Sequence, residues 1–180
     1  MVLLTKGNTK IHKAVGCFSI STESCHQRCP GCYAVKIERR WPSVSKAWKR
    51  NLDISKSDNF IDTMIIEAMD YEIVRVHVAG DFYSDEYIDK WESIASQCPS
   101  TMFYTYTKNL KALRLNNLDN FNVINSITPI GLNYGNEVHI RKLESLGYIR
   151  CPLTKNHKGL YCMKDCKICL TADKVCFLKH

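Results

Sequence analysis

Apolar residues along the chain follow two alternating periods. Short apolar, β-prone runs predict strands over residues 15–21, 73–79, 101–107 and 121–127. Apolar residues at helical spacing, or helix-permissive composition, predict helices in the segments 33–52, 57–68, 84–95, 109–118 and 137–146. Strand and helix thus alternate at least four times, which is typical of a parallel sheet with helical crossovers.

Local signals define several ends of these elements. Pro42 divides the first helical segment into two pieces. Ser57 and Asp58 are placed to cap the second helical segment, and Ser84 opens the third with acidic residues in the first turn, where the helix dipole favours them. Gly147 is placed to end the last helix.

Two reactive side chains are better explained as core residues than as parts of a functional site. In the strand over 73–79, Val74, Val76 and Val78 share one face, which puts His77 on the opposite face as a packed core histidine. Cys98, just before a proline, is expected to be a small buried hydrophobe.

Two architectures satisfy the alternation: an open doubly wound sheet and a partial barrel. We expect an α/β domain of the second kind, an incomplete TIM-like (βα) barrel of about five βα units over residues 1–149. Residues 150–180 lack this periodicity, and we expect them to form a cysteine-rich tail that binds a metal or cluster and packs on the same domain.

Sites in both architectures lie at the carboxyl ends of the strands. That rule places four segments on one rim: the loop 22–32, the turn Gly80-Asp81, the pair Thr107-Lys108, and Thr128.

Charge divides the 180-residue chain into three parts. Residues 1–56 carry eleven Lys/Arg and three Asp/Glu, residues 57–140 carry five and twelve, and residues 141–180 carry nine and three, which gives the net charge of +7. The chain has no apolar run long enough for a membrane helix and no signal-peptide pattern at its start, so we expect a cytoplasmic protein without a membrane partner. The ten cysteines are then more typical of metal ligands than of disulfides.

The sharpest motif is a CxxxCxxC run formed by Cys25, Cys29 and Cys32, on the loop after the first predicted strand. Thiolates at this spacing can hold three irons of a [4Fe–4S] cluster, and a structural zinc knuckle is the alternative. The fourth iron would either stay open for a small molecule or be closed by a distant thiolate, for which Cys17 is the nearest candidate.

This loop resembles that of the radical S-adenosylmethionine (SAM) superfamily, in which a CxxxCxxC run follows the first strand of a partial or full barrel. In that family SAM chelates the open iron, and a glycine-rich turn that ends in an acid, after the second strand, meets the SAM amino group. Gly80 and Asp81 stand in that position. The resemblance therefore implies that they bind SAM.

A likeness to the phage-associated gene-product-eighty-eight family of cysteine-rich proteins covers nearly the whole chain. It rests on the segments CYAVKIERRWPSV, VHVAGDFYSDEYIDKW and CPLTKNHKGLYCMKDCKICL. The resemblance implies a phage protein in the cytoplasm of the infected cell, with functional weight on Cys17, Cys25, Cys32, Asp81 and the tail cysteines.

The tail repeats the CxxxCxxC spacing in Cys162, Cys166 and Cys169, and either Cys151 or Cys176 could supply a fourth thiolate. Four thiolates suit a second iron–sulfur cluster or a structural zinc equally well. In another arrangement, tail and loop cysteines share one cluster across the fold.

Three other features have two interpretations each. Asp81 could cap the following helix instead of facing a ligand. His26 could bond a cluster sulfur or face solvent. The basic, aromatic stretch 36–50 could contact nucleic acid, although an ordinary solvated helical face explains it too.

These patterns predict an iron–sulfur protein of radical-SAM-like design. A reduced cluster would cleave SAM to a 5′-deoxyadenosyl radical that acts on a substrate, with Asp81 at the SAM amino group and a separate reductant supplying the electron. The alternative is a non-catalytic phage module whose metals are structural and which contacts nucleic acid or a host protein. Cys17 distinguishes the two hypotheses, because a cluster closed by Cys17 has no iron left for SAM.

Overall fold

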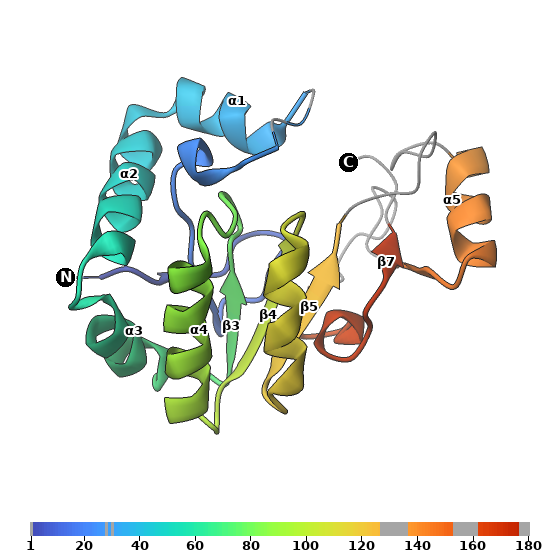
Figure 1. The fold of residues 1–180 in the computed structure, drawn as a ribbon. Coiled ribbons are helices and arrows are strands. Elements are labelled where there is room, and N and C mark those ends of the chain that lie inside the picture. Colours follow the sequence, from blue (N-terminus) through green and yellow to red (C-terminus); the bar gives the residue numbers. More distant parts are fainter. Residues whose placement is uncertain (1, 28, 30, 127–136, 153–161, 177–180) are drawn as a thin grey trace.

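The computed structural model describes residues 2–27, 29, 31–126, 137–152 and 162–176. Its centre is a five-stranded sheet whose strands follow one another in chain order (Figure 1). The strands are β1 (Thr5–Lys6), β2 (Val15–Cys17), β3 (Ile73–Val76), β4 (Met102–Thr107) and β5 (Phe121–Asn125). The pairs β2–β3, β3–β4 and β4–β5 are parallel, and β1 joins the edge of β2 in the antiparallel direction.

Helices connect the parallel strands, and all of them except the first pack on one face of the sheet. They are α1 (Tyr33–Arg40), α2 (Pro42–Lys56), α3 (Phe60–Ala68), α4 (Asp85–Gln97) and the 3-10 helix η2 (Leu110–Asn117). The buried stripe of α4, with Ile88 and Trp91 fully buried, meets Val74 of β3 and Phe103 of β4 in the main core. Consecutive strand order with these helices on one face differs from a doubly wound sheet, in which both faces carry helices.

The predicted α/β class is confirmed, and the strands and helices lie within a few residues of the predicted segments. The described residues form an open sheet with four parallel strands instead of about five βα units, and they do not close a barrel. Thr128, expected on the rim, lies outside the described residues.

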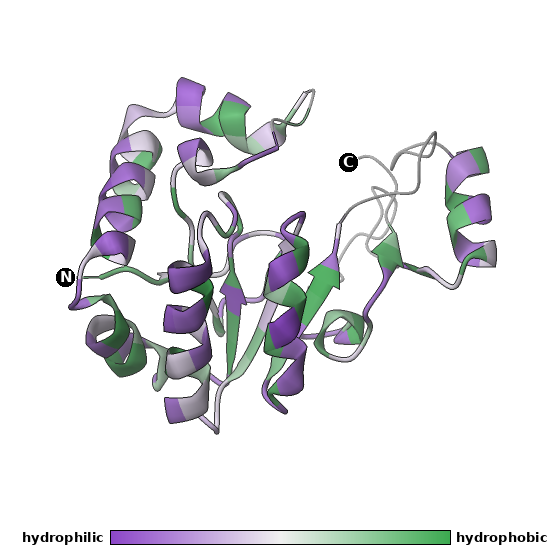
Figure 2. Ribbon diagram, in the orientation of Figure 1, coloured by the Kyte–Doolittle hydropathy of each residue, from purple (hydrophilic) through white to green (hydrophobic). Residues whose placement is uncertain are grey.

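The carboxyl-terminal segments are α5 (Glu137–Ser145), β6 (Ile149–Arg150), η3 (Ile168–Leu170) and β7 (Val175–Cys176), with β6 and β7 paired in parallel. Residues 163–175 pack on the other face of the sheet, whereas α5 packs on Cys176 and lies apart from the sheet (Figure 1). Met163, Cys169 and Val175 form a second core with Tyr104 and Ile124 of the sheet. Figure 2 shows that the strands between the two layers are largely hydrophobic.

The prediction for the strand over 73–79 is wrong at its end. Val74 and Val76 face the helices, but β3 ends there, and His77 adopts a positive φ of 60°. This turn brings His77 onto the helical side, where its ring contacts Phe82 and Tyr87, and it sends Val78 to the tail side. His77 is a packed core histidine, as expected, but it lies on the same side as the two valines.

The predicted helix ends are mostly confirmed. The chain breaks between α1 and α2 with Pro42 at the first position of α2, and the Ser84 hydroxyl caps α4 by accepting from the Tyr87 amide. Gly147, at φ 85°, follows the end of α5. The cap of α3 is wrong, because Asn59 holds that position without a side-chain bond and the Ser57 hydroxyl donates back to the Ile54 carbonyl.

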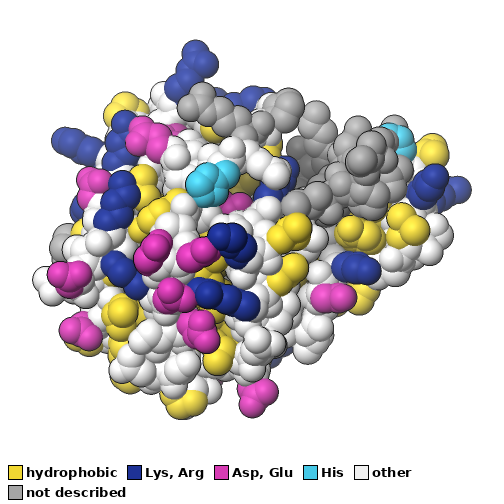
Figure 3. Space-filling view, in the orientation of Figure 1, with side chains coloured by type: hydrophobic (Ala, Val, Ile, Leu, Met, Phe, Trp, Pro, Cys, Tyr) yellow, Lys and Arg dark blue, Asp and Glu magenta, His cyan; other side chains and the backbone are white. Residues whose placement is uncertain are grey.

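No helix among the described residues is long and apolar enough to cross a lipid bilayer. In the space-filling view, basic side chains gather over α1 and α2, and acidic ones gather over α4 (Figure 3). Lys111 and Arg114 of η2 pair with acidic residues of α4, so both signs of charge meet on that part of the surface.

Candidate functional site

The first cysteine group lies on the loop between β2 and α1, where the sequence places it. A short 3-10 helix, η1 (Thr22–Ser24), leads into Cys25, and Cys32 holds the N-cap position of α1. The Cys32 amide donates to the Cys29 carbonyl at 3.2 Å, which curls the chain between the second and third cysteine. All three thiols are partly exposed.

Side chains of α1 anchor this loop to the sheet. The Glu38 carboxylate accepts from the Ser21 hydroxyl at 2.7 Å and from the amide and hydroxyl of Thr22. The Tyr33 hydroxyl, next to Cys32, donates to the Val78 carbonyl. The loop is therefore held at both ends by bonds that no sequence motif indicates.

The turn after β3 meets the cysteine loop directly. The Asp81 amide donates to the Ser24 hydroxyl at 3.1 Å, and His26 Nε2 lies 2.9 Å from the Tyr83 carbonyl. Gly80 has φ 89°, and a Cβ on it would lie 2.4 Å from the Ile20 side chain. Only glycine lets the two segments approach this closely.

The Asp81 carboxylate binds the end of β4. It accepts from the Thr107 hydroxyl, from the Lys108 amide at 3.1 Å and from the Phe82 amide at 2.8 Å. Burial raises the pKa of Asp81 although these three hydrogen bonds oppose the shift. The capping alternative is wrong, because Ser84 caps α4.

The loop thiols and Asp81 form one electrostatic group. Burial raises the pKa of the Cys25 thiol to about 11, and Asp81, Cys32 and Cys29 are close enough to raise it as well. Within the described part of the chain, no three His, Cys, Asp or Glu side chains converge on a single point as a metal site requires. The loop thus gathers suitable donors on one rim without closing them around a centre.

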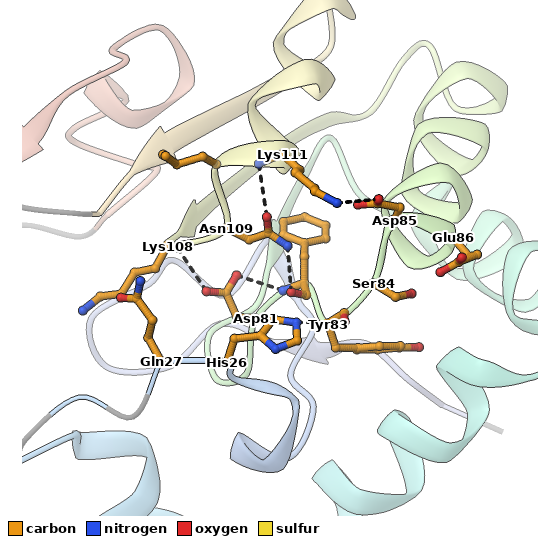
Figure 4. Close-up of a pocket in the computed structure, with 12 residues that line it drawn as sticks. His26, Gln27, Asp81, Tyr83, Ser84, Asp85, Glu86, Lys108, Asn109 and Lys111 are labelled. Carbon is orange, nitrogen blue, oxygen red and sulfur yellow. Dashed lines mark hydrogen bonds and ion pairs between the residues drawn. The ribbon is translucent and has the colours of Figure 1, made fainter.

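A cavity of about 590 Å³ opens beside this group (Figure 4). His26 and Gln27 of the loop, Asp81 of the turn and Lys108 and Asn109 after β4 form one side of it. On the opposite side Lys111 pairs with Asp85 at 2.7 Å. The cavity presents charges of both signs next to the cysteine loop, which suits a small zwitterionic or polar ligand.

The tail cysteines form a second group on the other side of the sheet. Cys162 and Cys166 face each other across a tight turn, in which the Met163 amide donates to the Cys166 carbonyl at 2.8 Å. Burial raises the pKa of Cys169 to about 12, and Cys162, Cys151 and Cys166 lie close enough to contribute. The Cys151 amide donates to the Cys176 carbonyl at 2.7 Å, so both proposed fourth ligands lie near this group.

Cys17 lies with the tail and not with the loop. Burial raises the pKa of its thiol to about 11, and its electrostatic neighbours are Arg75 and Cys162. The neighbours of Cys25, by contrast, are Asp81 and the other loop thiols. The structure therefore separates Cys17 from the loop that it was expected to complete.

The remaining candidate residues lie as follows. Cys98 is 2% exposed within the main core, and its thiol pKa is raised by burial. His26 bonds the Tyr83 carbonyl. Trp41, between α1 and α2, is 52% exposed with the Arg40 guanidinium 5.5 Å from its ring centre. Arg75 and Tyr104, which the sequence did not single out, both lie beside Cys17 and Cys162.

Comparison with known proteins shows the family of the chain. The chain is 27% identical over 179 residues to the gene 88 protein of Mycobacterium phage L5, covering 79% of this chain and 74% of that protein. It is 26% identical over 180 residues to the gene 88 protein of Mycobacterium phage D29, covering 79% and 75%. No solved structure matches. The family model described as gene product 88 matches residues 2–148, and the chain therefore belongs to the gene product 88 family.

Proposed function

We propose that this phage-family protein binds a [4Fe–4S] cluster through Cys25, Cys29 and Cys32, with its open iron directed to the neighbouring cavity. The observation that carries the proposal is the contact between two distant motifs. The Asp81 amide bonds Ser24, directly before Cys25, and so brings an acidic turn to the cysteine loop. A cluster at this position would face a cavity that can hold its ligand.

The donor set suits a three-thiolate cluster in kind, and its three members lie on one loop. The three thiols are partly exposed, lie on one loop and influence one another electrostatically. The two ends of the loop are fixed by the bonds of Glu38 and Tyr33, which hold it beside the turn at Asp81. When bound, such a cluster supplies an electron that can cleave SAM to a 5′-deoxyadenosyl radical.

Asp81 has the capacity for a ligand ammonium group. A carboxylate offers about four acceptor positions, and Asp81 uses three of them for Thr107, Lys108 and Phe82. One acceptor position is left for the amino group of SAM or of a similar zwitterion. The three existing bonds hold the carboxylate in place before the ligand arrives, which lowers the cost of binding.

Cys17 lies outside this site, and this favours an open iron. Its neighbours are Arg75 and Cys162, on the tail side of the sheet. For the tail we propose a separate closed site in which Cys151, Cys162, Cys166 and Cys169 hold a second cluster or a zinc ion.

A non-catalytic role is the second candidate. It is favoured by the basic surface over α1 and α2, where the exposed Trp41 ring carries Arg40 beside it (Figure 3). An aromatic ring within a basic surface suits single-stranded nucleic acid. Quenching of Trp41 fluorescence by an oligonucleotide, absent in Trp41→Leu, would support this role.

The test is anaerobic purification with measurement of iron, acid-labile sulfide and zinc per chain. Electron paramagnetic resonance of the reduced protein, with and without SAM, then reports on the open iron. We expect a signal that SAM changes, and its loss in Cys29→Ala but not in the matched control Cys98→Ala. A signal unaffected by SAM contradicts the enzyme, and zinc without iron contradicts the cluster.

A further inference from the structure

A row of four residues crosses the tail-covered face of the sheet. The strand registers pair Cys17 with Arg75, Arg75 with Tyr104, and Tyr104 with Asn122. Residues paired in this way present their side chains on the same face. The Asn122 amide group ties this row to the tail, because it donates to the carbonyls of Cys169 and Ala172 at 2.9 Å each.

Arg75 is a partly buried cation that forms no ion pair with a carboxylate of the described residues. Its Nε is buried and has no hydrogen-bond partner. Its guanidinium lies 5.3 Å from the Tyr106 ring centre and 6.0 Å from that of Tyr104. A buried charge without a partner is costly, so this position implies an anion.

The Tyr104 hydroxyl is a second buried polar group next to Arg75. It is buried next to Cys162 and makes no hydrogen bond of ordinary geometry. Two neighbouring side chains on the same face therefore each have a buried polar atom with no nitrogen or oxygen partner among the described residues, and the Cys162 sulfur is the acceptor beside Tyr104. Native proteins rarely leave such groups unsatisfied, and a ligand or ion that accepts hydrogen bonds from them is one explanation.

The hydrogen-bond acceptors around Arg75 and Tyr104 are cysteine sulfurs. The β2–β3 register places Cys17 beside Arg75, and Cys162 lies next to both Arg75 and Tyr104. Cys162 in turn lies near Cys166 and Cys169, and the Tyr106 hydroxyl is 2.6 Å from the Cys169 sulfur. The anion that fits this position is one built from these thiolates.

We propose that Arg75 is the counter-charge of an anionic metal–thiolate centre in the tail, and that it and Tyr104 donate hydrogen bonds to its sulfurs. The inference rests on the proposed binding of metal by the tail cysteines. A four-thiolate centre carries a charge of about −2 with either zinc or a [4Fe–4S]²⁺ core, so it needs such compensation when buried. Arg75 is thus a positioning residue of the centre and not a ligand.

The experiment isolates the tail by using the full chain with Cys25→Ala, Cys29→Ala and Cys32→Ala combined. The affinity of this triple variant for its metal is measured by competition with a chelator. The same measurement is then made after introducing Arg75→Met, Arg75→Lys or the exposed control Arg141→Met into the triple variant. We expect Arg75→Met to weaken metal affinity by about 10–100-fold, as loss of groups around a metal site typically does. Arg75→Lys keeps the charge and should recover most of the affinity, and Arg141→Met should match the triple variant.

Unfolding of the metal-free proteins in urea separates this role from a merely structural one. Without metal, Arg75 is a partly buried cation with no carboxylate partner among the described residues, so Arg75→Met should leave the apo protein as stable as its parent or more stable. Weaker apo stability in Arg75→Met, or metal affinity within about twofold of the triple variant, overturns the inference.

The two proposals can fail separately. If the triple variant holds no metal while the wild type holds iron, the counter-charge inference is wrong and the loop cluster stands. If only the tail holds metal, the loop cluster is wrong and the role of Arg75 stands. A wild-type protein that binds no metal contradicts both.

Discussion

The Thr107 hydroxyl donates a hydrogen bond to the Asp81 carboxylate and thereby joins the carboxyl ends of β4 and β3. The same carboxylate accepts from the Lys108 amide, so the end of β4 holds it twice. Since the Asp81 amide also bonds Ser24, one residue connects the cysteine loop with two strands.

Thr107→Val should therefore destabilise the fold. It keeps the shape of the side chain but leaves a largely buried carboxylate with one donor fewer, which costs about 1–3 kcal/mol in the free energy of unfolding. Urea denaturation measures this, and Thr107→Ser, which retains the hydroxyl, is the matched control. Equal stability of the Val and Ser variants would show that the backbone amides alone hold Asp81.

Gly80 and Gly147 form a matched pair for testing the close approach of the turn and the loop. Both have positive φ, but a Cβ on Gly147 meets nothing within 4 Å, whereas one on Gly80 collides with the side chain and carbonyl of Ile20. Gly147→Ala should cost about 1–2 kcal/mol for the backbone conformation alone.

Gly80→Ala should cost about 2–5 kcal/mol, because overpacking adds about 1–3 kcal/mol to the conformational term. Thermal unfolding of the two variants in parallel provides the comparison. Similar losses in both would mean that the Ile20 contact relaxes without cost.

The buried His77 should make the free energy of unfolding depend on pH. Burial lowers the pKa of His77 to about 3 in the folded protein, below the value of 6.5 expected for the unfolded chain. The unfolded state then binds the proton first, so stability is lost as pH falls from about 6.5 towards 3, at a slope of up to about 1.4 kcal/mol per pH unit from this residue.

His77→Asn should flatten the pH dependence in that range. Asparagine does not titrate and accepts the positive φ of this position, so the backbone is kept. Free energies of unfolding between pH 4 and 7, measured for both proteins, provide the test. A parallel decline in the variant would assign the pH dependence to other groups.

Cys17 and Cys25 should affect different metal centres. Cys25→Ala should remove the iron of the loop and the SAM-dependent change in the spectrum, because Cys25 lies with Asp81 and the other loop thiols. Cys17→Ala should leave both intact and weaken only the tail centre, because Cys17 lies beside Arg75 and Cys162. Analysis of iron, sulfide and zinc in both variants, with Cys98→Ala as control, shows which metal centre each cysteine affects. Loss of the SAM effect in Cys17→Ala would contradict this prediction and make Cys17 a ligand of the loop cluster.

Periodicity predicted the parts of the fold that depend on one element at a time. The buried stripe of α4 follows directly from apolar spacing, and its cap at Ser84 from local hydrogen bonding. The segment after β4 was predicted as a helix, and it is one, but in 3-10 form. Spacing does not separate the two forms over so short a segment.

Only one feature of the candidate site could be predicted from the sequence: the carboxyl ends of parallel strands lie at the same edge of the sheet. That rule placed the cysteine loop and Gly80-Asp81 together, and the Ser24–Asp81 bond shows that they meet. Glu38, Ser24 and Arg75 were missed, because their roles depend on partners between 16 and 57 positions away, or on a face of the sheet that no motif describes.

The sequence by itself determined the alternation of strands and helices, the two cysteine triplets and the family, because these depend on short-range spacing and residue type. Only the tertiary structure decided which side of the sheet each group occupies. The register of β2 beside β3 puts Cys17 next to Arg75 and near Cys162, and away from the cysteine loop that comes directly after it in the chain. Strand pairing brings together residues from distant segments, and a sheet separates residues that are near neighbours in sequence when they point to opposite faces.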